Sequence, residues 1–194
     1  NMEDHFKMLS VYFNNISIWG PQSEEYLIKN PNTKADIHMI VEHHMGIDKL
    51  DRLINKYKAK GMRALASAAH PSPLSEFGTN GGEAICVKKG INLVKVDQQI
   101  IEEHCRSSYP FFQACILKLK GVNILLISFY LLSNVGTGER NQIIIQQLQS
   151  VISMFQLQIL IVGDFNMTPK QMSESGWLKM SDVTILKPTN VKTT

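Results

Sequence analysis

The chain has 194 residues, of which 44% are hydrophobic and 19% charged, and its formal net charge is +3. This balance is typical of a globular domain with a substantial core, and the positive charge is too weak to indicate a nucleic-acid partner by itself. No segment reaches the roughly 20 apolar residues that a membrane helix needs, so we expect no membrane association.

The cysteines predict a reducing environment. Cys86, Cys105 and Cys115 cannot all pair within the chain, and none forms a Cys-x-x-Cys pair. Neither a disulfide framework nor a structural zinc site is therefore indicated, and we expect reduced thiols in an intracellular compartment.

The first half of the chain alternates strands and helices. Apolar runs predict strands over 7–13, 35–41, 62–68 and 83–87. Ser23 is the expected cap of a helix over 23–30. Apolar residues at helical spacing predict a second helix from 47, which Gly61 closes. Residues 70–82 form a predicted loop rich in Pro, Ser and Gly.

The second half begins with a predicted hairpin of strands over 111–119 and 122–132, joined at Lys120-Gly121. An amphipathic helix is expected over 139–155, and a strand buried on both faces over 159–162. Residues 167–194 are polar, and we expect them to be irregular. The pattern predicts a single α/β domain over 1–194, a layered sandwich of mixed β-sheets with outer helices. Strand order is not fixed by these patterns.

Polar side chains follow four of the predicted strands at the point where each strand ends. They are Asn15, Glu42, Tyr130 and the pair Asp164 and Asn166. If the strands lie side by side, two carboxylates, two amides and a phenol face one cleft. Carboxylate and amide oxygens suit Mg²⁺, which takes oxygen ligands and keeps several waters. The sequence therefore predicts a metal and phosphate site.

Each of these side chains also has a structural interpretation. Glu42 could cap the next segment or pair with a lysine, Tyr130 could be a core tyrosine, and the last pair could form an Asx turn. Asn14 is adjacent to Asn15, so a slip of one residue in register would exchange which of them faces the cleft. The spacing to Trp19 favours Asn15.

Other polar groups have mainly structural interpretations. His43 and His44 are adjacent at a strand end and should point apart, so we expect one to pack and one to be solvated. Residues 136–138 resemble a phosphate-binding loop only in part and are interpreted as a turn. Basic residues on and after the second helix form either a solvated face or a surface that follows a nucleic-acid backbone: Lys49, Arg52, Lys56, Lys58, Lys60 and Arg63.

The order of these motifs resembles that of the endonuclease/exonuclease/phosphatase superfamily, which has the deoxyribonuclease I-like fold. Details around Asn15, Glu42 and Trp177 look most like the endonuclease domains encoded by retroelements. The segments that carry the resemblance are Asn15-Ile16-Ser17, Ile40-Val41-Glu42-His43, Gly81-Gly82-Glu83-Ala84-Ile85, Ser128-Phe129-Tyr130 and Val162-Gly163-Asp164-Phe165-Asn166.

The resemblance implies a role for each site residue. Glu42 would ligate Mg²⁺ (or Mn²⁺), and Asn15 would support the metal or the scissile phosphate. Tyr130 would donate a hydrogen bond to the phosphate. Asp164 would orient or deprotonate the attacking water, and Asn166 would hold the phosphate or Asp164. The implied reaction is metal-assisted hydrolysis of a phosphoester, with DNA as the expected partner and the nucleus as the expected location of a retroelement enzyme.

One family element has no counterpart in this sequence. The family carries a late Ser-Asp-His or similar motif, whereas here Ser181-Asp182 precedes Val183 and no histidine follows His104. The resemblance therefore implies a C-terminally incomplete sandwich that lacks its last strands, with impaired or no activity. Strands left unpaired would expose a sheet edge and favour self-association.

Two other functions fit the same residues. The first is a phosphatase of phosphoinositides or small phosphoesters, because the core residues serve both reactions. The second is a non-catalytic relative that binds nucleic acid or another partner, which the missing late histidine favours.

Overall fold

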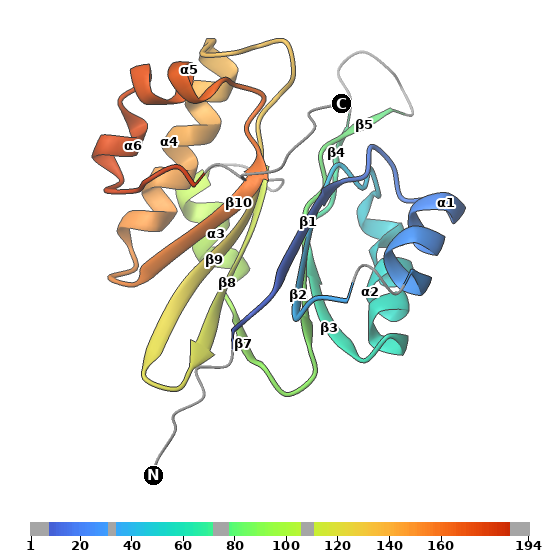
Figure 1. Cartoon of the computed structure of the whole chain (residues 1–194). Helices are drawn as coiled ribbons and strands as arrows, with labels where there is room; N and C mark the ends of the chain where they lie inside the picture. The colour runs from blue at the N-terminus through green and yellow to red at the C-terminus, as the bar shows by residue number, and fades with distance from the viewer. Residues whose placement is uncertain (1–7, 31–33, 72–77, 106–110, 187–194) are drawn as a thin grey trace.

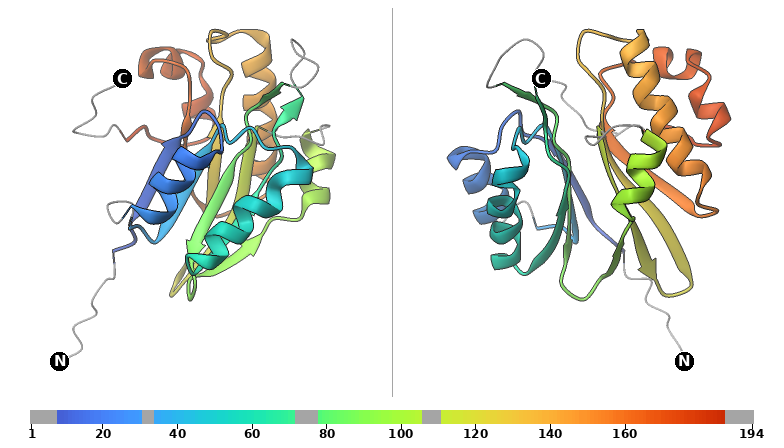
Figure 2. Two further views of the ribbon diagram at one scale, coloured as in Figure 1. Left: turned by 90° about the vertical axis from the view of Figure 1, so that its right-hand side faces the viewer. Right: turned by 180° about the vertical axis from the view of Figure 1, so that it is seen from behind.

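Two four-stranded β-sheets pack face to face, and helices cover their outer faces (Figures 1 and 2). The structure is a computed structural model that describes residues 8–30, 34–71, 78–105 and 111–186. The layers run helix, sheet, sheet, helix, which confirms the predicted α/β sandwich of mixed sheets with outer helices.

The first sheet combines one parallel pair with two antiparallel pairs. β1 and β2 run parallel, with Asn15 opposite Val41 at their carboxyl ends. β6 pairs antiparallel with both β2 and β3. The strand order is β1 (Val11–Asn15), β2 (Ile37–Val41), β6 (Ala84–Lys88) and β3 (Met62–Ala66).

Short helical segments cover the outer face of this sheet. The first begins at Pro21, and the prediction of Ser23 as its cap is wrong by three residues. Gly20 is its N-cap, and Ser23 lies in the first turn, where its hydroxyl accepts a hydrogen bond from the Gly20 N–H. Gly61 follows the later helix with φ +80, which confirms its predicted place after the helix end. The segments are α1 (Pro21–Glu24), η1 (Glu25–Lys29), η3 (Ile47–Lys49) and α2 (Leu50–Ala59).

The second sheet repeats this arrangement. β9 and β10 run parallel, with Tyr130 opposite Asp164 at their carboxyl ends. β8 and β9 form the predicted hairpin, which turns at Gly121 with φ +84. The strand order is β10 (Gln158–Asp164), β9 (Val122–Tyr130), β8 (Phe112–Leu119) and β7 (Asn92–Lys95).

The helices of this half are α3 (Gln98–Cys105), α4 (Glu139–Ser153), α5 (Pro169–Glu174) and α6 (Trp177–Met180). The prediction of an irregular segment after residue 167 is wrong for α5 and α6. Thr168 caps α5 through a bond from the Gln171 N–H, and Trp177 is buried in the core. Residues 187–194 lie outside the described part of the chain. A two-stranded ribbon of β4 (His70–Pro71) and β5 (Thr79–Asn80) lies within the predicted loop.

Alternation along the strands divides the apolar residues between inner and outer layers. Met39 on β2 and Leu126 on β9 belong to the core between the sheets. Their neighbours Ile40 and Leu125 instead pack under the helices of their own sheets. Both faces of each sheet are therefore covered, which explains why these strands have nearly continuous apolar sequences.

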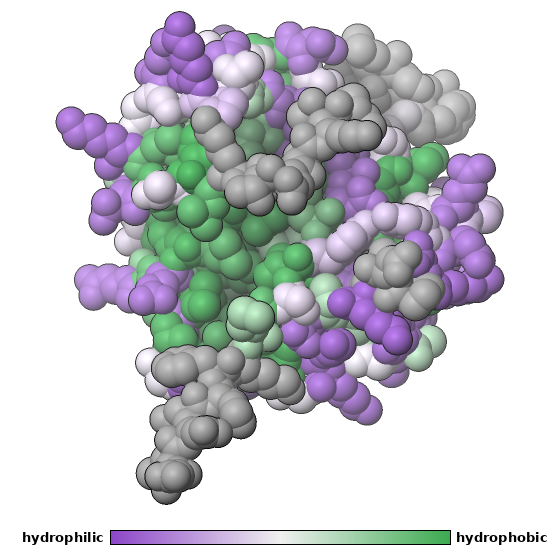
Figure 3. Space-filling view, viewed as in Figure 1, coloured by the Kyte–Doolittle hydropathy of each residue, from purple (hydrophilic) through white to green (hydrophobic). Residues whose placement is uncertain are grey.

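β10 differs from the prediction. It was expected to be buried on both faces, but it is an edge strand whose side chains are only partly buried. Ile159 and Ile161 pack toward the helices, and Leu160 and Val162 toward the other sheet. Figure 3 shows a broad hydrophobic area over this part of the molecule. Self-association through such an edge stays a prediction.

None of the helices in the described residues is long and apolar enough to cross a membrane. Cys86 and Cys115 are free and buried, and burial raises the pKa of the Cys115 thiol to about 12. Such thiols react slowly because the thiolate is the reactive form.

Gly163 allows β10 to approach β9 closely, because a Cβ at this position would lie 2.0 Å from the Phe129 carbonyl oxygen. We expect Gly163→Ala to lower the free energy of unfolding by roughly 1–3 kcal/mol or more, as for other overpacked sites. Urea unfolding measures this change. Gly20→Ala is the control, because nothing lies within 4 Å of its added carbon, and its expected effect is only that of a less favourable N-cap residue. Equal stability of the two variants would contradict the close approach.

Candidate active site

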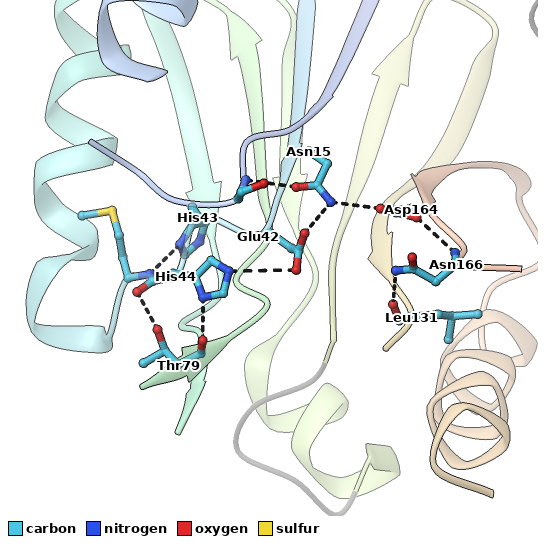
Figure 4. Close-up of polar contacts among 10 residues, drawn as sticks. Asn15, Glu42, His43, His44, Thr79, Leu131, Asp164 and Asn166 are labelled. Carbon is cyan, nitrogen blue, oxygen red and sulfur yellow. Dashed lines mark hydrogen bonds and ion pairs between the residues drawn. The ribbon is translucent and has the colours of Figure 1, made fainter. Parts of the chain in front are cut away.

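The carboxyl ends of the two parallel strand pairs meet, and Asn15 joins them. Its side chain lies at the end of β1, and Glu42 directly follows β2. The Asn15 Nδ2 donates to Glu42 Oε2 at 2.5 Å and to Asp164 Oδ2 at 2.9 Å (Figure 4). The two bonds place both carboxylates around one amide, although Asp164 belongs to the other sheet.

The register of β1 decides between the two adjacent asparagines. Phe13 belongs to the core between the sheets and Tyr12 to the outer core. Asn15 therefore shares the inner face with Phe13, and Asn14 shares the outer face with Tyr12. The structure thus places Asn15 in the site, as the spacing to Trp19 predicted.

The backbone around the site adopts unusual conformations. Left-handed φ angles cost roughly 1–3 kcal/mol at non-glycine residues and concentrate at functional sites. Four of the six such residues in the described ranges lie at or beside this site: Ser17, Glu42, His44 and Asn166. Glu42 (φ +59) and His44 (φ +54) flank His43 in this segment. The Glu42 side chain faces Asn15, the His44 side chain faces Thr79, and the His43 side chain points away from both (Figure 4).

Hydrogen bonds hold this strained segment in place. The His43 and His44 N–H groups donate to the carbonyls of Gly82 and Gly81 at 3.2 and 3.0 Å. The Thr79 hydroxyl donates to the His44 carbonyl at 2.9 Å. The Gly-Gly pair that begins β6 is therefore part of the support for the site.

Tyr130 lies beside the two acids and is only 4% exposed. Burial, followed by hydrogen bonding to Glu42, raises the pKa of its phenol well above the ordinary value of 10.0. The phenol therefore stays protonated and can donate a hydrogen bond. The interpretation of Tyr130 as a core residue is also partly right, because its ring is buried next to Phe111.

Asn166 fixes the position of Asp164. Its backbone N–H donates to Asp164 Oδ1 at 3.1 Å, and its side-chain amide donates to the Leu131 carbonyl at 2.6 Å. The first bond is that of an Asx turn. Asp164 and Asn166 therefore form the turn that was the alternative prediction, and Asp164 also lies in the site. The side chain of Asn166 itself is directed to Leu131 (Figure 4).

Two buried ionisable residues beside the site were not assigned a role from the sequence. Glu83 is fully buried and accepts a bond from the Ser67 hydroxyl at 3.1 Å. Burial raises its pKa to about 8, and the charge of Glu42 adds to this shift. His43 is also fully buried, and burial lowers its pKa to about 4. The sequence signal for Glu83 was a charged residue directly before an apolar run over residues 84–87.

Gly82 makes room for the buried His43 ring. A Cβ on Gly82 would lie 2.5 Å from Cε1 of that ring, and Gly82 has φ +91. His43 Nδ1 accepts a bond from the Met45 N–H at 3.1 Å. This confirms that one of the two adjacent histidines packs, while His44 is partly exposed.

Four of the basic residues between α2 and β3 have structural partners away from these acids. Arg52 and Lys56 form ion pairs with Glu24. Lys60 donates to the Leu27 carbonyl and Arg63 to the Leu93 carbonyl. These contacts favour the interpretation of a structural, solvated surface.

The donor groups of the site fit a partly hydrated divalent ion. Glu42 and Asp164 present carboxylate oxygens around one amide, and a cation would offset the proximity of two like charges. In the described residues, no group of three or more His, Cys, Asp or Glu side chains surrounds one point. The protein would therefore supply part of the coordination, as is usual for Mg²⁺, which keeps several waters.

The sequence matches no protein-family model and no curated protein. Solved structures do match the fold. The endonuclease domain of TRAS1, a telomere-specific non-LTR retrotransposon, is 16% identical with a TM-score of 0.62, and the match covers 95% of this chain and 75% of that one. An endonuclease/exonuclease/phosphatase family protein from Leptotrichia buccalis is 12% identical with a TM-score of 0.56, over 87% and 73% of the two chains.

The human Nocturnin catalytic domain also matches, at 15% identity and a TM-score of 0.52, and the chain spans 63% of its length. The fold is thus shared at low sequence identity. The chain has the deoxyribonuclease I-like fold.

The buried Glu83 carboxyl predicts a pH-dependent stability. Its folded pKa of about 8 lies above its ordinary value of 4.5, so between these pH values the folded state holds a proton that the unfolded state has released. The contribution of protonated Glu83 to the free energy of unfolding is fully present below pH 4.5 and is lost as the pH rises toward 8. Glu83→Gln cannot ionise, so its advantage over the unmodified chain should grow between pH 5 and pH 8.

Urea unfolding at pH 5, 6.5 and 8 measures this effect. Glu174→Gln is the matched control, because the Glu174 side chain is 62% exposed. If the difference in the free energy of unfolding between Glu83→Gln and the unmodified chain stayed constant over this range, the proposed protonation of buried Glu83 would be contradicted.

Proposed function

We propose that this chain is a divalent-metal-dependent phosphoesterase domain that hydrolyses phosphodiester bonds in nucleic acid. The observation that carries the proposal is the bridge from the Asn15 amide to Glu42 and Asp164, which come from different sheets. Convergence of two acids, an amide and a buried phenol at the ends of parallel strands gives the groups that such a reaction requires.

Each residue takes a role that its contacts support. Glu42 would hold the metal, and a divalent ion there would offset phosphate charge and stabilise the leaving oxygen. Asn15 keeps Glu42 and Asp164 in place. Asp164, whose other oxygen is fixed by the Asn166 N–H, would orient the attacking water and accept its proton. Tyr130, protonated and facing Glu42, would donate a hydrogen bond to a phosphate oxygen.

DNA is the proposed substrate, and a retroelement is the proposed origin. The support is the match to a retrotransposon endonuclease domain over 95% of this chain, together with the motif details around Asn15 and Glu42. An enzyme of this kind would act on DNA in the nucleus.

A phosphatase is the second candidate. ANGEL2, described as a 2′,3′-cyclic phosphatase, matches the fold with a TM-score of 0.50 over 83% of this chain and 54% of that one. The same acids would serve both reactions, and the substrate distinguishes them. A non-catalytic role in binding nucleic acid or another partner is the third candidate.

Replacing the acids should separate metal binding from catalysis. We expect Glu42→Gln to weaken Mn²⁺ binding at least about tenfold in calorimetry, because it removes a charged oxygen ligand. Asp164→Asn should lower the rate of plasmid nicking by about 10²–10⁴-fold, the usual value of a general base. Single-turnover conditions with excess protein suit this test, because we expect turnover to be weak.

Asn14→Ala is the control, since this side chain shares the outer face of β1. Nicking by the unmodified chain that survives Asp164→Asn would refute the proposed role of that acid. Hydrolysis of a soluble phosphoester without nicking would select the phosphatase. Mn²⁺ binding that is unaffected by Glu42→Gln would overturn the metal site.

A further inference from the structure

His44 is held beside Glu42 in a defined orientation. Its Nδ1 lies 2.5 Å from the carbonyl oxygen of Thr79, and the Thr79 hydroxyl donates to the His44 carbonyl at 2.9 Å. A carbonyl oxygen can only accept, so Nδ1 carries the hydrogen of this bond. In the neutral ring, Nε2 then presents a lone pair.

This lone pair faces Glu42 across a short gap (Figure 4). The distance from His44 Nε2 to Glu42 Oε1 is 3.9 Å, and the two side chains are 22% and 19% exposed. A neutral Nε2 and a carboxylate oxygen are both acceptors, so they do not hydrogen-bond to each other directly. Two atoms that each lie about 2.0–2.2 Å from one ion are at most about 4.4 Å apart, so a cation can be shared across this gap at a wide ligand–metal–ligand angle.

The bond from His44 Nδ1 to the Thr79 carbonyl is of the kind that metal-binding histidines make. Histidine ligands almost always donate their second ring N–H to a carboxylate, a backbone carbonyl or water, which fixes the tautomer and orients the ring. Thr79 provides such a carbonyl from the β4–β5 ribbon. The left-handed backbone at both Glu42 and His44 brings these side chains together, although their neighbour His43 is buried on the other side.

We propose that His44 contributes an imidazole nitrogen to the divalent ion bound by Glu42, so that the site prefers Mn²⁺, Co²⁺ or Zn²⁺ to Mg²⁺. The inference rests on the proposed function, because it assumes a metal at Glu42. Imidazole suits transition metals, whereas Mg²⁺ prefers oxygen ligands. Two side-chain ligands leave positions open for water and phosphate oxygens, consistent with the absence of a three-residue His, Cys, Asp or Glu cluster in the described ranges.

Pulsed EPR of the Mn²⁺-loaded chain tests the nitrogen ligand directly. We expect a ¹⁴N coupling from a coordinated imidazole, which disappears in His44→Gln. Calorimetry should show Mn²⁺ affinity falling at least about tenfold in that variant, with Mg²⁺ affinity changed less than about threefold. Circular dichroism and thermal unfolding confirm that each variant is folded.

A further variant acts as the control. His70→Gln makes the same exchange at a histidine that stacks on Phe111, and it should keep the coupling. A Mn²⁺ complex that depends on Glu42 but shows no ¹⁴N coupling, or keeps it in His44→Gln, would overturn this inference and leave the proposed function intact. Metal binding independent of Glu42 would instead overturn the proposed function.

Discussion

The Asn15 amide contacts both halves of the molecule at the point where the site forms. Its two N–H groups donate to Glu42 on its own sheet and to Asp164 on the other. The carboxylates of Glu42 and Asp164, which bond the same amide nitrogen, would repel each other without a donor or a cation between them. The amide supplies the donor, and the parallel pairs β1–β2 and β9–β10 supply the alignment, because the carboxyl ends of parallel strands lie at one edge. A second bond between the sheets, from the Ser128 hydroxyl to the Ile40 carbonyl, lies one layer deeper in the core.

The site combines rigid strands with a strained connection. Asn15 and Asp164 are the last residues of regular strands, so their positions follow from the sheets. Glu42 and His44 instead depend on left-handed backbone held by Gly81, Gly82 and Thr79. The same segment buries His43 and brings the protonated Glu83 close to the charged site. Burial of Glu83 reduces stability at high pH and burial of His43 reduces it at low pH. Such perturbed groups are common in functional regions.

Most of the longer strands and the two longest helices, α2 and α4, could be predicted because their signals are local, whereas β7 and α3 were not predicted. Gly121 identified the hairpin, and helical spacing with Gly61 identified α2. Short elements were harder: the region of α5 and α6 is polar in composition, and its helices depend on a capping box at Thr168 and on burial of Trp177. The apolar sequence of β10 indicated burial but not its place at a sheet edge. An apolar run indicates that its side chains avoid water, but it does not show which neighbours cover them or how completely.

By itself, the sequence determined the α/β class, most of the longer strands and helices along the chain, and the polar residues that end the strands. Only the tertiary structure decided that Asn15 rather than Asn14 faces the acids, that Asn166 turns to Leu131, and that His44 lies against Glu42. The reason is the range of the interactions. Backbone preference and periodicity act over a few residues, whereas the bond from Asn15 to Asp164 spans 149 positions and exists only when both sheets have packed.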